Sequence, residues 1–250
     1  MGFRDELERL VRLQATELQA RDLQAQLGGL PAEREECQAR VSAAEAGVAD
    51  AEASRDAAQA EHRRLEGELQ AAEAQVDKYR EQEMQVRTNQ QLWAIQDEIK
   101  TVQGKISKIE EQILELMEAA DGLSDGIKAA QDVLGAAKAE TATEIAAIDQ
   151  REKELGDALA AETNAGNELR AETEPKLITL YDRVATVRGG IAVAEGIDGR
   201  CSACNVRLRP QIWVQVLNLV EPQQCDACKR IIFVRDSLSL PSTVSVDANA

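Results

Sequence analysis

A regular hydrophobic pattern runs through the middle of the chain. From Leu92 to Ala137, apolar residues recur at alternating spacings of three and four positions. This spacing places one apolar stripe along a helix and favours a left-handed supercoil with a second helix. Residues 92–137 are therefore predicted to form one strand of a coiled coil.

A weaker, alanine-rich stripe precedes the first one, from Val41 to Val86. The two stripes are out of phase by two positions, which on one continuous helix would rotate the stripe by about 200°. The chain is therefore expected to break between them. Thr88 and Gln91 have the spacing of a capping box, which marks the start of a helix. We expect residues 86–90 to form the tip of an antiparallel hairpin.

Two further irregularities interrupt the predicted hairpin. Residues 28–31 contain two glycines and a proline, which should interrupt the first arm, because glycine weakens a helix and proline removes a backbone donor. Pro175 marks a second kink or a restart of the helix. The sequence thus predicts a coiled-coil hairpin over residues 1–188, with kinks near 28–31 and 173–175.

The composition agrees with long helices. The chain is 44% hydrophobic but only 2% aromatic, and a thick globular core normally needs more aromatic residues. An ordinary two-domain enzyme is therefore not expected. The first residues carry no apolar run long enough for a signal peptide or a membrane span. We therefore expect a cytoplasmic protein that does not contact membranes.

Two pairs of cysteines mark a different kind of segment near the end of the chain. Cys201 and Cys204 form one C-x-x-C unit, and Cys225 and Cys228 form a second one. Each unit can present two thiolates to one side of a tetrahedral metal ion. Four soft sulfur ligands favour one structural Zn²⁺ ion with no open position for catalysis. Disulfides and an iron–sulfur cluster are the alternatives.

Residues 189–236 are predicted to form a small zinc ribbon. Apolar runs at 191–194 and 231–234 have the composition of short strands. The segment that begins at Pro210 fits either a short helix or a strand. The metal should supply much of the folding free energy of so small a module, on the order of 10 kcal/mol. Residues 237–250 are predicted to be a disordered tail.

The charge is unevenly distributed. The net charge of −16 should repel nucleic acids over most of the surface. From Gly196 to Arg235, however, basic residues outnumber acidic ones. Trp213 lies in the same segment and could stack on a base. If the ribbon binds RNA or DNA, the candidate basic residues are Arg200, Arg207, Arg209, Lys229 and Arg230.

Three stretches carry a resemblance to a known family. The sequences "GGIAVAEGIDGRCSACNVRLRPQ" and "CDACKRIIF" look like the C4-type zinc ribbon of a bacterial family with a long N-terminal coiled-coil hairpin. The sequence "VRTNQQLWAIQDEI" resembles that family's tip motif, a Thr-Asn pair before a polar residue and an aromatic. The departures are mild: Gln91 replaces a frequent Glu, and Asn205 and Lys229 replace a common Gly.

The resemblance implies a mainly α fold, in which a long antiparallel coiled-coil hairpin is followed by a small C-terminal C4 zinc ribbon with short β-strands. Members of the family are described as nucleic-acid-binding proteins, adaptors or chaperones, with links to flagellar or secretion machinery. The resemblance thus agrees with the pattern of the residues but leaves several functions open.

The leading hypothesis is a non-enzymatic, zinc-binding adaptor or chaperone-like protein that binds protein partners through its tip and its ribbon. The candidate tip residues are Thr88, Asn89, Gln91 and Trp93, although Trp93 fits simple packing at the tip equally well. The sole histidine, His62, lies on the seam and is interpreted as a core residue. No Gly-rich phosphate loop is present, so neither catalysis nor a small-molecule substrate is expected.

Two alternatives remain. The first is an RNA- or DNA-binding ribbon, whose affinity would be weak and strongly dependent on salt. The second is a transcription-machinery factor that acts through its coiled-coil tip. Such factors use paired acidic residues at the tip, whereas this tip offers uncharged ones, from Thr88 to Gln91.

Overall fold

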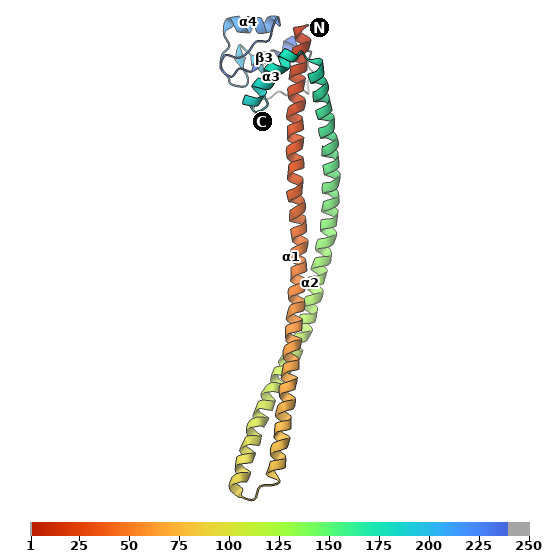
Figure 1. Cartoon of the computed structure of the whole chain (residues 1–250), viewed down its shortest axis with the longest axis vertical. Helices are drawn as coiled ribbons and strands as arrows, with labels where there is room; N and C mark the ends of the chain where they lie inside the picture. Colours follow the sequence, from red (N-terminus) through yellow and green to blue (C-terminus); the bar gives the residue numbers. More distant parts are fainter. Residues whose placement is uncertain (1, 240–250) are drawn as a thin grey trace. The chain divides into compact units, whose positions relative to one another are not determined.

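The computed structural model describes residues 2–239, which are mostly helical (Figure 1). Its elements are α1 (Phe3–Glu83), α2 (Asn89–Glu172), α3 (Pro175–Val187), β1 (Val193–Ile197), β2 (Arg200–Cys201), α4 (Pro210–Asn218), β3 (Ile231–Phe233) and a 3₁₀ turn (Arg235–Ser237). The predicted fold class, a helical hairpin followed by a small module with short strands, is confirmed.

The chain divides into two compact units. The coil unit is Arg34–Ala146, and the ribbon unit combines Met1–Glu33 with Ala147–Ala250. This division differs from the predicted one, which separated the whole hairpin from the ribbon at residue 188. The reason is that the first turns of α1 contribute side chains to the core that also contains β1 and β3.

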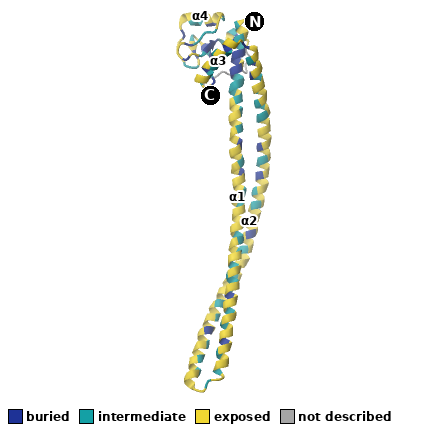
Figure 2. Ribbon diagram, viewed as in Figure 1, coloured by how far each residue is buried: buried dark blue, intermediate teal, exposed yellow. Residues whose placement is uncertain are grey.

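In the coil unit, α1 and α2 form an antiparallel pair that buries the predicted seams. Leu65 and Val76 of α1 and Val102 and Ile127 of α2 are all buried. Every other predicted seam residue of α2 is at least half-buried, except Ala120. Figure 2 shows these residues as narrow blue and teal stripes on otherwise exposed helices. The predicted coiled coil is therefore confirmed.

The turn of the hairpin lies between Glu83 and Asn89 and overlaps the predicted tip at residues 86–90. The backbone N–H of Gln91 donates to Thr88 Oγ1 over 3.3 Å. The N–H of Leu92 donates to the carbonyl oxygen of Thr88. Thr88 therefore caps α2, because its side chain satisfies one of the N–H groups that a helix start leaves unpaired.

The predicted interruption at residues 28–31 is not a break in the helix. α1 continues through this segment with Pro31 inside it. Leu30 is buried, and Glu33 pairs with Arg151 of α2 at 2.5 Å. Packing against α2 therefore keeps the segment helical, although proline removes one hydrogen bond. The irregular sequence does lie beside the boundary between the two units.

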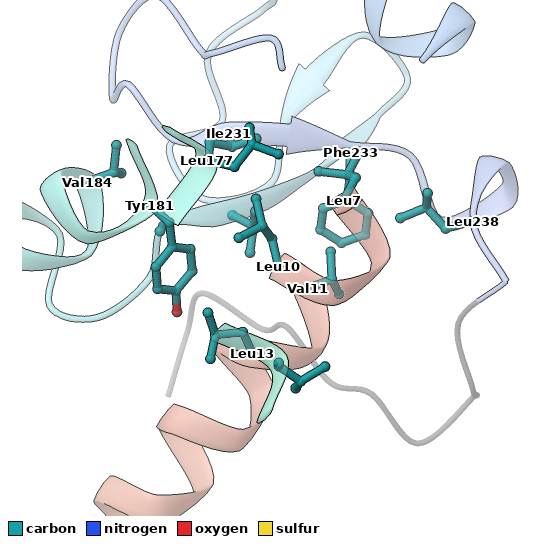
Figure 3. Packing of buried hydrophobic residues seen from close by; sticks show 13 residues of the cluster. Leu7, Leu10, Val11, Leu13, Leu177, Tyr181, Val184, Ile231, Phe233 and Leu238 are labelled. Atoms are coloured by element: carbon teal, nitrogen blue, oxygen red, sulfur yellow. The ribbon is translucent and has the colours of Figure 1, made fainter. Parts of the chain in front are cut away.

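The core of the ribbon unit is one cluster of thirteen buried side chains (Figure 3). Leu7, Leu10 and Leu13 of α1 meet Tyr181 of α3 and Phe233 of β3 in this cluster. The Tyr181 hydroxyl donates to Glu17 Oε2 at 2.7 Å, so its polar end is satisfied within an apolar surrounding. The spacing of the leucines places them on one face of α1.

The small sheet has the strand order β2-β1-β3. β1 pairs antiparallel with β2 and parallel with β3. The fully buried side chain of Gln14 accepts hydrogen bonds from the N–H groups of Ala192 and Val193 and donates to the Val193 carbonyl at 3.0 Å. One α1 side chain therefore satisfies backbone groups at the start of β1.

The start of the predicted disordered tail is ordered. Ser237 ends the 3₁₀ turn, and Leu238 is buried in the main core. The N–H of Ser239 donates to Glu8 Oε1 at 2.6 Å. Apolar burial of Leu238 explains why order extends beyond residue 236, while residues 240–250 lie outside the described part of the chain.

Among residues 2–239, the structure contains no helix with an apolar stretch long enough to cross a membrane. Figure 2 shows in yellow that most residues of α1 and α2 are exposed.

Candidate metal centre

The four cysteines predicted to bind a metal come together in the ribbon unit. Their sulfur atoms all lie within 4.8 Å of one another. Cys201 and Cys228 are 3.7 Å apart, and Cys204 and Cys225 are 3.6 Å apart, measured between sulfurs. Four sulfurs around a tetrahedral ion at about 2.3 Å would be separated by about 3.8 Å. The residues therefore fit a single tetrahedral metal ion.

Each C-x-x-C unit lies on the same kind of turn. In the first, the N–H of Asn205 donates to the Cys201 carbonyl, and the Cys201 N–H donates to Val206. In the second, the N–H of Lys229 donates to the Cys225 carbonyl, and the Cys225 N–H donates to Arg230. We call these turns the first and second knuckles, residues 201–206 and 225–230.

Both knuckles need a left-handed residue after the second cysteine. Asn205 has a φ of 57° and Lys229 a φ of 65°. Asparagine tolerates this conformation better than most residues, whereas lysine is strained there. These are the two positions at which the resembled family commonly has Gly. The structure shows that Lys229 adopts the left-handed conformation.

Burial and backbone N–H groups act on the thiols in opposite directions. Burial raises the pKa of Cys201 and of Cys225, and hydrogen bonds from the backbone of Ala203 and Cys204 partly offset that effect at Cys201. Burial also raises the pKa of the Cys228 thiol, but hydrogen bonds outweigh this effect and lower the pKa below its ordinary value. The strongest of these hydrogen bonds involves the backbone of Arg230. A metal would displace the remaining thiol protons, because thiolates are the ligands.

A second, smaller cluster of apolar residues surrounds the cysteines. It contains Val216 of α4, Ile232 of β3 and Trp213. A Cβ atom placed on Gly196 would lie 2.7 Å from the Trp213 ring, so glycine is needed for this close contact. The Trp213 ring is partly buried and packs against Gly196 of β1. Stacking of this ring on a base stays a prediction.

Two arginine side chains hold the second knuckle in place through hydrogen bonds to backbone carbonyl groups. Arg188, at the end of α3, donates through Nε to the Cys228 carbonyl at 2.9 Å. Arg230 donates through Nε to the carbonyl of Ile191 at 2.9 Å. Sequence reasoning missed both roles, and also missed that of Gln14. No local pattern reveals a side chain that bonds to a distant carbonyl.

The five basic residues proposed for nucleic-acid contact have mixed surroundings. Arg209 pairs with Asp226 at 3.1 Å, and Arg200 donates to the Asn205 carbonyl. Arg230 is engaged with Ile191 as described above. Arg207 and Lys229 are exposed. Three of the five basic side chains, those of Arg200, Arg209 and Arg230, therefore already support the fold of the ribbon.

The four candidate tip residues lie together at the turn of the coil unit. Thr88, Asn89 and Gln91 are exposed, although Thr88 also caps the helix. Trp93 is 73% exposed, and Met84, which follows α1, is 81% exposed. The sequence left Trp93 undecided between a partner contact and simple packing at the tip. The structure places it largely in solvent.

Comparisons with known proteins agree with this fold. None of the curated proteins matches the chain. The structure of CT398 from Chlamydia trachomatis is similar with a TM-score of 0.79 and 18% identity, and the match covers 93% of this chain and 99% of that one. HP0958 from Helicobacter pylori is similar with a TM-score of 0.56 and 15% identity, over 94% and 99% of the two chains.

A protein from Mycobacterium smegmatis is similar with a TM-score of 0.51 and 21% identity, over 90% and 98% of the two chains. At these identities, the likeness concerns the fold. The sequence also matches the CT398-like coiled coil hairpin domain over residues 12–189, which is the helical part and excludes the four clustered cysteines. Since this match spans most of the sequence, the chain belongs to the family of CT398-like coiled-coil hairpin domains.

Proposed function

We propose that this protein is a non-enzymatic adaptor with a chaperone-like use of its coiled-coil hairpin, whose ribbon is folded by one structural Zn²⁺ ion. The observation that carries the proposal is the closed set of four sulfurs on two equivalent knuckles. A metal held by Cys201, Cys204, Cys225 and Cys228 would have no open position for a substrate. The site is therefore suited to structural support.

Zinc is favoured over other metals by the ligands and their surroundings. Four thiolates in a tetrahedral arrangement suit Zn²⁺, and paired C-x-x-C units are a common structural zinc site. Three of the four cysteines are buried, which protects the site from competing ligands. Ligation by thiolates also favours a reducing compartment such as the cytoplasm.

Protein partners are favoured at the hairpin tip. Trp93 and Met84 expose large apolar surfaces close to the turn, and exposed aromatic residues are typical of protein interfaces. Thr88, Asn89 and Gln91 add polar groups around them. The tip therefore has the mixture of apolar and polar groups that protein interfaces have.

The metal assignment is tested by native mass spectrometry of the protein purified without added metal. We expect a mass that corresponds to one Zn²⁺ ion per chain, and its loss in a Cys201→Ser/Cys225→Ser variant. Cys37→Ser is the matched control, since Cys37 lies in the coil unit and should leave the zinc content unchanged. Bound iron, or a chain that never carries metal, would contradict the assignment.

The adaptor role is tested by in-cell crosslinking with variants of each surface. A Trp93→Ala/Met84→Ala variant should lose one set of crosslinked proteins, and the double cysteine variant should lose another. Leu114→Ala is a matched control, because Leu114 is an exposed apolar residue away from the tip. If both variants retain every partner of the unchanged protein, the proposal fails.

A nucleic-acid-binding ribbon is the second candidate, and the exposed Arg207 and Lys229 favour it. Against it stand the intramolecular contacts of Arg200, Arg209 and Arg230. Binding of RNA or DNA to the full chain in a salt titration separates the two candidates. A steep loss of binding with salt that Arg207→Gln makes shallower would favour nucleic acid.

The third candidate, a transcription-machinery factor that acts through its tip, has less support. The described turn presents Thr88, Asn89 and Gln91 rather than a pair of carboxylates. Crosslinks from the tip to RNA polymerase would support this third candidate over the other two.

A further inference from the structure

A cavity of about 410 Å³ lies between α3 and the second knuckle. Its α3 side is lined by Arg183, Val184, Val187 and Arg188. These positions follow the helical repeat and so share one face of α3. A volume of this size is typical of sites that hold a few side chains or a small ligand.

The charge of the cavity differs from that of the chain. Three of its lining residues are cationic, namely Arg183, Arg188 and Lys229, and none is acidic. The chain as a whole carries a net charge of −16. By contrast, the cavity between α1, α2 and α3 is lined by Glu17, Glu162 and Asp182 together with arginines. Cys228 also lines the cavity, and in a zinc-loaded site the four thiolates and the ion would together contribute about −2. The three cations outweigh this charge, so the local potential stays positive and attracts an anionic group.

The knuckle side of the cavity is held in place by hydrogen bonds. Arg188 Nε donates to the Cys228 carbonyl, which leaves its two terminal nitrogens available for a ligand. Gln224 Nε2 donates to the Lys229 carbonyl at 2.7 Å. The first contact connects the end of α3 with the second knuckle, and the second contact holds the knuckle itself. The cations are therefore presented on a prearranged surface, which lowers the entropic cost of binding.

Lys229 is an independent indication of a binding role. It has a φ of 65°, where glycine would be free of strain and lysine is not. The equivalent residue in the first knuckle is Asn205, which tolerates this conformation better. Strained residues that persist in a structure are often found at binding sites. The strain suggests that the lysine ammonium group is useful at this position.

We propose that this cavity binds an acidic, partly apolar peptide segment of a protein partner. Carboxylates would pair with Arg183, Arg188 and Lys229, and an apolar side chain would cover Val187, which is 71% exposed. The exposed Val187 favours a peptide over a nucleic-acid backbone, which would bring only charge and sugar to it. This inference rests on the proposed role of the ribbon in protein binding, and it names the chemistry of the partner.

The test measures binding of defined probes to the full zinc-loaded chain by fluorescence anisotropy. The probe is a labelled peptide that alternates glutamate and leucine, and the matched control peptide has glutamine at each glutamate. A short single-stranded RNA is the third probe. We expect the acidic peptide to bind more tightly than the other two probes, with an affinity that falls between about 50 mM and about 500 mM salt.

Two variants locate the binding to this cavity. Lys229→Gly should weaken peptide binding about three- to tenfold, because one cation is lost. The same variant should melt at an unchanged or higher temperature, because glycine relieves the strain. Asn205→Gly is the matched control, since it makes the same backbone change in the first knuckle and should leave binding unchanged. Arg183→Gln should weaken binding by a similar factor, with Arg63→Gln in the coil unit as its control.

Zinc content is measured on every sample, so that loss of the metal is not mistaken for loss of a contact. Absence of acidic-peptide binding, equal binding of the glutamine peptide, or unchanged binding by both Lys229→Gly and Arg183→Gln would overturn the inference. So would tighter binding of RNA through the same residues. If the ribbon-dependent crosslinks persist in these variants, the adaptor proposal survives while the cavity assignment fails.

Discussion

In the coil unit, buried residues such as Leu65 and Val76 are separated by several turns of helix, whereas the ribbon unit gathers thirteen buried residues in one cluster. The coil unit has one apolar seam between two helices, and solvent reaches every other face. The ribbon unit surrounds its core with α1, α2, α3 and two strands. The same two long helices thus take part in two different kinds of packing.

This difference in packing predicts how far the effect of a single substitution spreads in each unit. In a seam, each residue contacts a few neighbours, so a local change has a local effect. In the ribbon unit, each core residue contacts several elements, and a metal on the four cysteines would join two turns that are distant in sequence. A change there should affect the unit as a whole. The following predictions test this comparison.

Loss of a metal ligand should have the largest effect. Cys201→Ser should remove the metal and with it folding free energy on the order of 10 kcal/mol from the ribbon. The sheet and knuckles should lose their structure, while α1 and α2 keep most of the helical circular dichroism. Cys37→Ser is the control, and its zinc content should match that of the unchanged protein. Loss of helicity over the coil unit in Cys201→Ser would show that the two units do not respond separately to loss of the metal.

Equal truncations in the two units should have unequal effects. Leu10→Ala should lower the free energy of unfolding by about 3–5 kcal/mol, because Leu10 is fully buried among several elements. Leu65→Ala should lower it by about 2 kcal/mol, because water can reach the gap in a two-helix seam. Chemical denaturation of each variant gives these values. Equal losses would show that the two units pack alike.

Truncation of the buried Gln14 side chain should lower the free energy of unfolding more than truncation of an exposed helix residue does. Gln14→Ala leaves the N–H groups of Ala192 and Val193 and the Val193 carbonyl without this partner, which should cost about 1–3 kcal/mol. Gln24→Ala on the exposed surface of α1 is the matched control and should be neutral. The measurement is the midpoint of urea unfolding. A Gln14→Ala midpoint equal to that of the control would refute the role.

Ion pairs across the coil should have the smallest effect. Lys138 pairs with Glu45 at 2.9 Å, and both side chains are more than half exposed. Lys138→Gln should therefore change the free energy of unfolding by about 0.5 kcal/mol or less. Thermal melts at low and high salt should agree for this variant. A loss comparable to that of Leu65→Ala would show that charges rather than the seam hold the helices together.

The sequence predicted the coil well, because its seam repeats with a period that few other structures share. Thr88 likewise predicted the start of α2, because capping depends on residues that are close together in the chain. The core of the ribbon unit was less predictable. Leu7, Leu10 and Leu13 looked like ordinary helix positions, and only the folded chain shows that they meet β3 and α3.

The clustering of the four cysteines was predictable to the residue, because two C-x-x-C units indicate a shared site through their spacing. The surroundings of the site were not. Arg188 and Arg230 bond to carbonyl groups about forty residues away, and such contacts have no sequence signal. The same limit explains why the basic residues of the ribbon looked like a nucleic-acid surface before their own contacts were visible.

Hydrogen exchange of the full chain, before and after a zinc chelator, tests the central claim most directly. The account predicts that chelation removes amide protection from β1, β3 and both knuckles, that added Zn²⁺ restores it, and that residues 34–146 keep their protection throughout. Mass spectrometry of the same sample shows when the metal is gone. If β1, β3 and the knuckles keep their protection at that point, the claim that the metal holds them together is contradicted.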